Sequence, residues 1–237
     1  MPERQILGVL GGMGPLASAA FVQTVYRLNP AAREQDLPRV LLDSMPAFPD
    51  RTEAIRSGRD TELVRRLDTH LRRLVEAGAE EVVVACFTAH HFLPRLAPEL
   101  LPRVRSLIDQ TVHALAARDG RYLLLCTDGT RQARVFPRHP CWPEVADRVV
   151  WPDDGDQRGV HRMLYRMKQG GALTEAADLV SALRSRYRCT GVILGCTELH
   201  LVGDRLVERL GGSQVLDPLR EIALSLWTRT AQPLLAA

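Results

Sequence analysis

Lysine is almost absent from this chain of 237 residues: among 31 basic residues only Lys168 is a lysine, and the others are arginines. Long apolar runs are missing too. The longest, such as 82–86, have the length of a strand, so no membrane-spanning helix is expected. The net charge is only +3, and no basic cluster or aromatic platform accompanies it, which argues against binding to nucleic acid or to a membrane surface. The 46% apolar and 25% charged residues are typical of a soluble globular protein.

Cysteine usage argues against a disulfide framework. The five cysteines are an odd number, and no two of them form a CxxC pair. The first residues place Glu3 before a short apolar run, which is not the pattern of a secretory signal. We therefore expect reduced thiols in a cytoplasmic protein.

Short apolar runs alternate with helical patterns along the chain. Strands are expected at about 5–10, 39–43, 81–86, 122–126, 149–151, 191–195 and 215–216. Helices are expected between them, including one over 102–118, whereas 44–58 is expected to be an irregular loop. Such alternation predicts an α/β fold with parallel sheets wound by right-handed crossovers, and functional loops at the carboxyl ends of the strands.

Two sequence signals occur twice in the same order. One strand ends in the turn 11–14, and about 75 residues later another ends at Cys86. In the second half a strand ends at 126–130, and about 70 residues later another ends at Cys196. This repetition predicts two pseudo-symmetric Rossmann-like half-domains with the active site in the cleft between them. The expected boundaries are 1–105 and 106–215, with 216–237 packing back on the first half.

Cys86 and Cys196 each lie just past a β-branched strand, at a strand-to-helix turn. Backbone N–H groups at such turns bind anions and lower the pKa of a thiol, so either cysteine could act as a base or an acid near neutral pH. Two such groups on opposite faces of one carbon suit the inversion of an sp³ centre beside a carboxylate. The alternative interpretation is that both are small buried apolar residues.

The chain resembles the aspartate/glutamate racemase superfamily, closest to its aspartate racemase branch. The resemblance is carried by Leu10-Gly11-Gly12-Met13-Gly14-Pro15, Pro49-Asp50-Arg51-Thr52, Cys86-x-Thr88-Ala89-His90, Thr127-x-Gly129-Thr130 and Gly195-Cys196-Thr197-Glu198. It implies racemisation of a small, acidic amino acid by Cys86 and Cys196 without pyridoxal phosphate or any other cofactor or metal. It also implies a homodimer whose only other partner is the small-molecule substrate.

The resemblance also implies the substrate-binding residues. Arg51 and Lys168 match positions that bind carboxylates, and guanidinium and ammonium groups suit that role. Glu198, His90 and His200 are auxiliary candidates, with packing or hydrogen bonding as the alternative for each. The remaining predicted substrate contacts are Met13, Phe87, Thr88, Thr130 and Thr197.

Phe87 departs from the family pattern, which has asparagine after the first cysteine. A phenyl ring offers no polar contact and fills space, so we expect Phe87 to line the pocket and to alter the substrate or the reaction. The main alternative is therefore a superfamily member with changed chemistry, a decarboxylase or isomerase of a small carboxylic acid. Cys126 is also unusual for the family and is expected to be a buried apolar thiol.

Three other functions remain as alternatives. Gly12-x-Gly14-x-x-Ala17 with Asp43 fits a dinucleotide-binding fingerprint, although that pattern is short and permissive. A zinc site could form if cysteines and histidines of the two turns converge, namely Cys86, His90, His91, Cys196 and His200. A binding protein without catalytic activity could also keep the pocket.

Overall fold

The computed structural model describes the chain over residues 6–231, and its side chains over residues 6–226. Gln5, at the start of the first expected strand, and the last six residues of the expected C-terminal segment lie outside this range.

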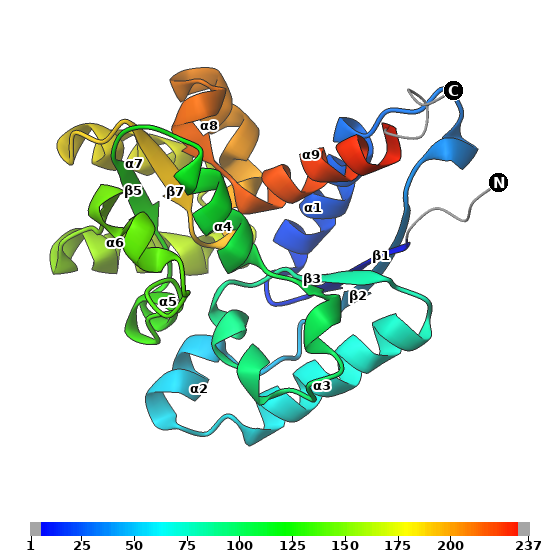
Figure 1. Ribbon diagram of the computed structural model, residues 1–237. Coiled ribbons are helices and arrows are strands. Elements are labelled where there is room, and N and C mark those ends of the chain that lie inside the picture. Colours follow the sequence, from blue (N-terminus) through cyan, green and yellow to red (C-terminus); the bar gives the residue numbers. More distant parts are fainter. Residues whose placement is uncertain (1–5, 232–237) are drawn as a thin grey trace.

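Two four-stranded parallel sheets form the framework (Figure 1). The first has the order β2 (Arg39–Ser44), β1 (Ile6–Gly11), β3 (Glu81–Val84), β4 (Val104–Arg105). The second has the order β6 (Val149–Val150), β5 (Tyr122–Leu125), β7 (Gly191–Leu194), β8 (Val215–Leu216). Numbered within its own half, each sheet has the order 2-1-3-4. The prediction of two pseudo-symmetric α/β halves with parallel sheets is confirmed.

The strand register brings the functional turns to one edge of each sheet. In the first sheet Leu10 lies opposite Val84, so the glycine turn after β1 and the Cys86 turn after β3 lie next to each other. In the second sheet Leu125 lies opposite Leu194, so the turn after β5 and the Cys196 turn after β7 also lie next to each other. Functional groups at the carboxyl ends of parallel strands gather in this way.

Helices cover the sheets as their apolar faces require. In the first half, α1 (Pro15–Leu28) and α3 (Thr61–Glu76) lie on opposite faces of the sheet (Figure 1). Leucines recur along α3 at 63, 67, 71 and 74, which is the spacing of one buried helical stripe, and all four are buried. The second half contains α4 (Leu107–Ala116), α5 (Asp128–Gln132), α6 (Asp154–Lys168), α7 (Leu173–Arg186) and α8 (Gly203–Leu210).

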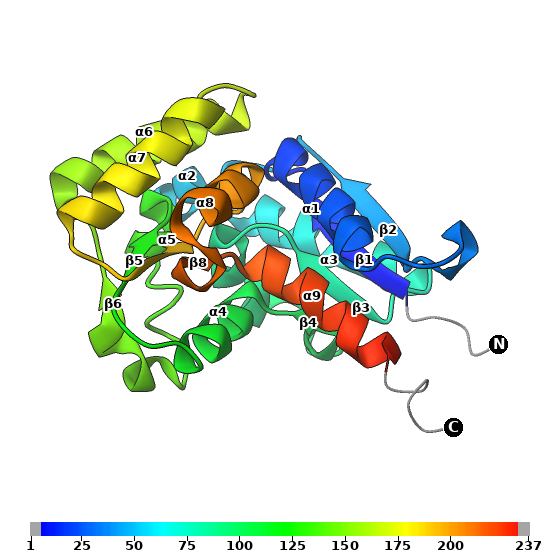
Figure 2. The ribbon, with the colours of Figure 1, turned by 90° about the horizontal axis from the view of Figure 1, so that it is seen from above.

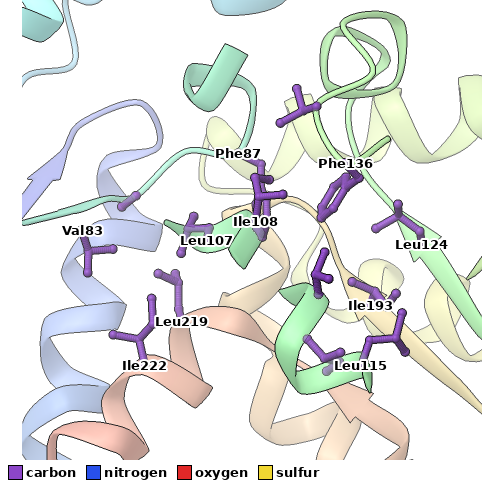
Figure 3. Close-up of a cluster of buried hydrophobic side chains, with 14 of the residues drawn as sticks. Val83, Phe87, Leu107, Ile108, Leu115, Leu124, Phe136, Ile193, Leu219 and Ile222 are labelled. Carbon is purple, nitrogen blue, oxygen red and sulfur yellow. The ribbon is translucent and has the colours of Figure 1, made fainter. Parts of the chain in front are cut away.

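The last helix, α9 (Pro218–Ala231), packs against α1 and α4, which are far from it in the sequence (Figure 2). The Asn29 side chain, at the end of α1, donates to the Ala223 carbonyl at 2.9 Å. One apolar core is shared by the two halves. It contains Val83 from the first sheet, Leu124 and Ile193 from the second, and Leu219 from α9 (Figure 3). The two halves are therefore joined by a common core.

Two predicted elements were wrong. Residues 44–58 are not all irregular, because α2 (Arg51–Ser57) begins there with Asp50 accepting a hydrogen bond from the Glu53 N–H at 2.8 Å. Residues 102–118 are not one helix. The strand β4 precedes α4, and the Ser106 side chain, which lies between the two, caps the N-terminus of α4. Within residues 6–231, no helix combines the length and the apolar character needed to cross a bilayer.

A glycine at the contact between the halves gives a test of this packing. A Cβ on Gly129 of α5 would lie 2.6 Å from Thr52 Oγ1 and 2.9 Å from its Cα in α2. We expect Gly129→Ala to destabilise the protein by about 1–3 kcal/mol, the usual cost of overpacking, as measured by urea unfolding. Gly159→Ala in α6, where nothing lies within 4 Å of a Cβ, is the control and should stabilise by about 0.5–1 kcal/mol. Equal gains from both variants would contradict the close approach of α2 and α5.

Candidate active site

The two cysteine turns meet at the junction of the halves. Cys86 and Cys196 are 5% and 6% exposed. The Thr197 hydroxyl donates to the Ala85 carbonyl at 3.2 Å, so the residues adjacent to the two cysteines are hydrogen-bonded to each other across the junction. Both thiols also lie close enough to Lys168 to influence its pKa. The arrangement brings together the two predicted catalytic residues.

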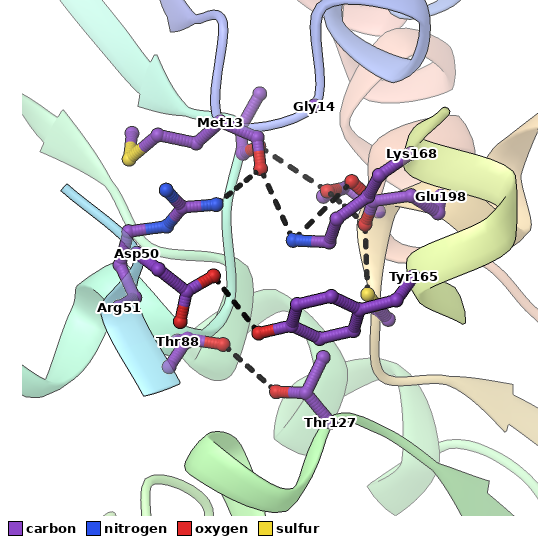
Figure 4. A network of polar contacts seen from close by, with 12 residues as sticks. Met13, Gly14, Asp50, Arg51, Thr88, Thr127, Tyr165, Lys168 and Glu198 are labelled. Carbon is purple, nitrogen blue, oxygen red and sulfur yellow. Dashed lines mark hydrogen bonds and ion pairs between the residues drawn. The ribbon is translucent and has the colours of Figure 1, made fainter. Parts of the chain in front are cut away.

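A buried carboxylate touches one of the two thiols. Cys196 Sγ donates to Glu198 Oε2 at 2.8 Å (Figure 4). Burial and then the Glu198 charge raise the pKa of the Cys196 thiol well above its ordinary value. Glu198 fits here because Gly14 has no side chain, since a Cβ at that position would lie 2.1 Å from Oε1.

Both predicted carboxylate-binding cations lie in the same cluster (Figure 4). Arg51 Nη2 donates to the Met13 carbonyl at 2.8 Å, and Lys168 Nζ approaches the same oxygen at 3.4 Å and Glu198 Oε1 at 3.7 Å. Burial opposes both charges, but Cys86 and Asp50 raise the pKa of Arg51, and Glu198 and Cys196 raise the pKa of Lys168. Both groups are therefore cations at neutral pH.

Three threonine hydroxyls from the two halves form a buried cluster. Thr88 Oγ1 lies 2.8 Å from Thr130 Oγ1 and 3.0 Å from Thr127 Oγ1, and the last two lie 3.1 Å apart. Thr127 also caps α5 by accepting from the Thr130 N–H. These hydroxyls supply both donors and acceptors at the junction.

Sequence reasoning missed Asp50 and Tyr165. The Tyr165 hydroxyl of α6 donates to Asp50 Oδ2 at 2.9 Å, which links the second half to the start of α2 (Figure 4). Lys168 Nζ lies 5.1 Å from the centre of the Tyr165 ring. Two signals were present: Tyr165 is three residues before Lys168 on one helix, and Asp50-x-x-Glu53 has the spacing of a helix cap.

His90 and His200 play equivalent structural parts. His90 Nε2 accepts from the Leu107 N–H at the start of α4 at 3.0 Å, so Nδ1 carries the proton and donates to the Cys86 carbonyl at 2.9 Å. His200 Nδ1 lies 2.6 Å from Asp217, which precedes α9. His90 thus links the Cys86 turn to α4, and His200 links the helical turn after Cys196 to α9. In each half, this helix follows the fourth strand.

Phe87 lies elsewhere than expected. Its ring belongs to the shared core and packs 5.5 Å from the Phe136 ring and 6.3 Å from the His90 ring (Figure 3). The expectation that the ring lines the pocket is corrected, because the turn after β3 directs it into the core. Cys126 is fully buried, and burial raises the pKa of its thiol to about 12.

The remaining alternatives find little support in the contacts. The Glu198 carboxylate lies against Gly14 at the start of α1, where a dinucleotide phosphate would need an open, positive site. Asp43, the expected ribose ligand, lies 2.6 Å from His70. Among the residues that the structure describes, no three His, Cys, Asp or Glu side chains are grouped so that they could hold a metal ion.

A comparison with known families decides the classification. The model of the Asp/Glu/hydantoin racemase family matches residues 10–226. This chain belongs to that family. The membership indicates a racemase-type enzyme and confirms the resemblance seen in the sequence.

Solved structures agree on the fold. An aspartate racemase from Picrophilus torridus is 23% identical, with a TM-score of 0.78 over 96% of this chain and 94% of its own. An aspartate racemase homologue from Pyrococcus horikoshii is 21% identical, with a TM-score of 0.68 over 96% and 99%. A glutamate racemase from Francisella tularensis, solved with D-glutamate, is 13% identical, with a TM-score of 0.67 over 100% and 84%.

The position of Phe87 leads to a stability prediction. Phe87→Asn should lower the free energy of unfolding by about 3–5 kcal/mol, because it leaves a cavity and buries an amide among apolar side chains. Phe87→Leu should lose clearly less, and urea unfolding of both variants measures the difference. An asparagine variant as stable as the parent, with a changed substrate profile, would place the ring in the pocket instead.

His90 should make stability fall in mild acid. Burial lowers its pKa from 6.5 to about 4. The folded protein therefore binds this proton less readily than the unfolded chain, so the stabilisation is complete above pH 6.5 and is lost as the pH falls toward 4. We expect a loss of about 3 kcal/mol over this range, reduced in His90→Gln but not in the exposed His113→Gln control, by urea unfolding at each pH. Identical pH profiles for all three proteins would contradict the assignment.

Proposed function

We propose that this chain is a cofactor-independent racemase of a small, acidic amino acid, with Cys86 and Cys196 as its acid–base pair. The observation that carries the proposal is the meeting of two duplicated cysteine turns beside one buried and one partly buried cation. The Thr197–Ala85 hydrogen bond joins the turns, and Arg51 and Lys168 share the Met13 carbonyl next to them.

The chemistry needs only these groups. One cysteine, as a thiolate, takes the α-proton and becomes a thiol, and the electron pair left on the α-carbon spreads into the substrate carboxylate. The other cysteine gives its proton to the opposite face and becomes a thiolate, so the configuration inverts. Arg51 and Lys168 would stabilise the negative charge that develops on the carboxylate in a site that excludes water.

Two cations suit an amino acid with two carboxylates. Arg51 Nε is buried and has no hydrogen-bond partner among the described residues, so it can still donate to a ligand. The polar contacts of Lys168 with Met13 and Glu198 are long, at 3.4 and 3.7 Å. Both groups can form short, charge-assisted bonds with a carboxylate.

The alternative reaction, decarboxylation or isomerisation of a small carboxylic acid, depended on an apolar Phe87 ring in the pocket. That ring lies in the core, so the alternative has lost the feature that favoured it. The homodimer and the cytoplasmic location stay predictions, and light scattering after size-exclusion chromatography tests the first.

Single-cysteine variants test the mechanism. Cys86→Ala and Cys196→Ala should each reduce racemisation by about 10²–10⁴-fold, the usual contribution of a general acid or base. In deuterium oxide, each variant should still exchange the α-proton of one enantiomer without inverting it, and the two variants should act on opposite enantiomers. NMR over a panel of amino acids and small diacids measures both exchange and inversion.

The half-buried Cys141, which lies in a loop outside the cluster, gives the control: Cys141→Ser should racemise normally. Racemisation that survives both alanine substitutions would disprove the two-thiol mechanism. Carbon dioxide release without exchange into the amino acid would instead support the decarboxylase.

A further inference from the structure

The two cysteine turns are duplicated in fold but not in charge. The third residue of the first turn is Thr88, and the third residue of the second is Glu198. The Thr88 hydroxyl bonds to Thr127 and Thr130. The Glu198 carboxylate bonds to the cysteine of its own turn. A pair of thiols that the fold makes equivalent is therefore made unequal by one residue.

Glu198 is held against Cys196 from several sides. It is 2% exposed. Oε2 accepts from the Cys196 thiol at 2.8 Å and lies 3.5 Å from the Thr197 hydroxyl, while Oε1 fits against Gly14 and lies 3.7 Å from Lys168 Nζ. The carboxylate can move little without losing these contacts or colliding with the turn after β1.

The charged groups around the two thiols differ in sign. Glu198 contacts Cys196 directly and raises the pKa of its thiol. The Lys168 ammonium on α6 lowers the same pKa, but its effect is smaller than that of the carboxylate. On the other side, the Arg51 guanidinium on α2 interacts with Cys86. A thiolate is favoured beside a cation and disfavoured beside a carboxylate.

We propose that Glu198 is a positioning residue that keeps Cys196 protonated in the resting protein, so that Cys86 is the resting base and Cys196 the resting acid. The assignment of base and acid rests on the proposed function. The placement of the proton does not, because it follows from the Cys196–Glu198 contact alone.

The proton balance gives Glu198 a definite part in turnover. Cys86 accepts the α-proton of one enantiomer while Cys196 gives its proton to the opposite face, which leaves Cys196 as a thiolate next to the carboxylate. Glu198 exchanges no proton in this scheme, and its carboxylate disfavours that thiolate. The protein then returns to its resting form when Cys196 regains a proton and Cys86 loses one, either by the reverse reaction or through solvent.

Alkylation of the unmodified protein tests the proposal without any substrate. Iodoacetamide is uncharged and reacts with thiolates, and Cys86 and Cys196 are almost equally exposed, so their relative rates report the thiolate fraction. With limited reagent at pH 7.5, peptide mass spectrometry should find Cys86 modified at least about 10-fold faster than Cys196. Equal rates, or faster modification of Cys196, would overturn the proposal.

A near-isosteric variant provides the second arm. Glu198→Gln keeps the size of the side chain and removes its charge, so modification of Cys196 should accelerate at least about 10-fold and its pH profile should move to lower pH. Cys86 should change little. The control is Glu62→Gln on α3, whose carboxylate pairs with surface arginines, and it should leave both rates as they were. An unchanged Cys196 rate in a folded Glu198→Gln protein would overturn the proposal.

The two proposals can fail separately. If the labelling pattern appears but no amino acid is racemised or exchanged, the proposed function fails and the placement of the proton stands. If racemisation is found and Cys196 is alkylated first, the placement fails and the proposed function stands. Should Glu198→Gln not fold, as judged by circular dichroism, the rates in the unmodified protein still decide.

Discussion

A small set of charges is buried between the two parallel sheets, and their burial restricts how the two halves can be arranged. Arg51, Lys168 and Glu198 are all largely removed from water. Charges in such a place are tolerated only when they are paired and hydrogen-bonded. The Met13 carbonyl and the Cys196 thiol supply those partners from the two halves, so the cluster requires that both sheet edges face each other.

Duplication explains how the two edges come to face each other with matching chemistry. Each half places a cysteine after its third strand and a histidine four residues later. The histidines bind at the starts of α4 and α9, the helices that follow the fourth strands. These equivalent contacts hold the two thiols in related positions. The single exchange of Thr88 for Glu198 then makes the pair electrically unequal, and the proposed acid–base roles use this difference, because one thiol is to be protonated while the other is not.

The sequence was sufficient for the strands and turns because buried parallel strands appear as short apolar runs, and glycine or cysteine turns follow the two central strands of each sheet. The sequence was insufficient where the local signal for a helix or a strand lay next to a stronger signal for another kind of structure. The two prolines in 44–58 obscured the Asp50-x-x-Glu53 cap that begins α2. The two residues of β4 make too short a run to interrupt a helical pattern, and only pairing with β3 defines them as a strand.

Residue directions were harder to predict than residue positions. Cys86, Phe87 and Thr88 are consecutive, yet Cys86 and Thr88 interact with polar groups at the junction and Phe87 packs in the shared core. Alternation along a strand does not continue through the turn after it, so the sequence could not say which way the ring points. Tyr165 could have been paired with Lys168 from helical spacing, but its partner Asp50 lies 115 residues away and belongs to the other half.

The enclosure of the cluster limits how the proposed substrate can reach it. Its side chains are nearly all buried, with Thr130 at 1% and Cys196 at 6% exposure, so the described arrangement is closed. Polar contacts cross the junction at the cluster, among them the threonine cluster, the Tyr165–Asp50 bond, the Lys168–Met13 contact and the Thr197–Ala85 bond. Polar contacts of this kind exchange readily with water, whereas the apolar core shared by the halves does not. For the proposed substrate to enter, these polar contacts are the ones that can give way while the halves stay joined through the core and α9.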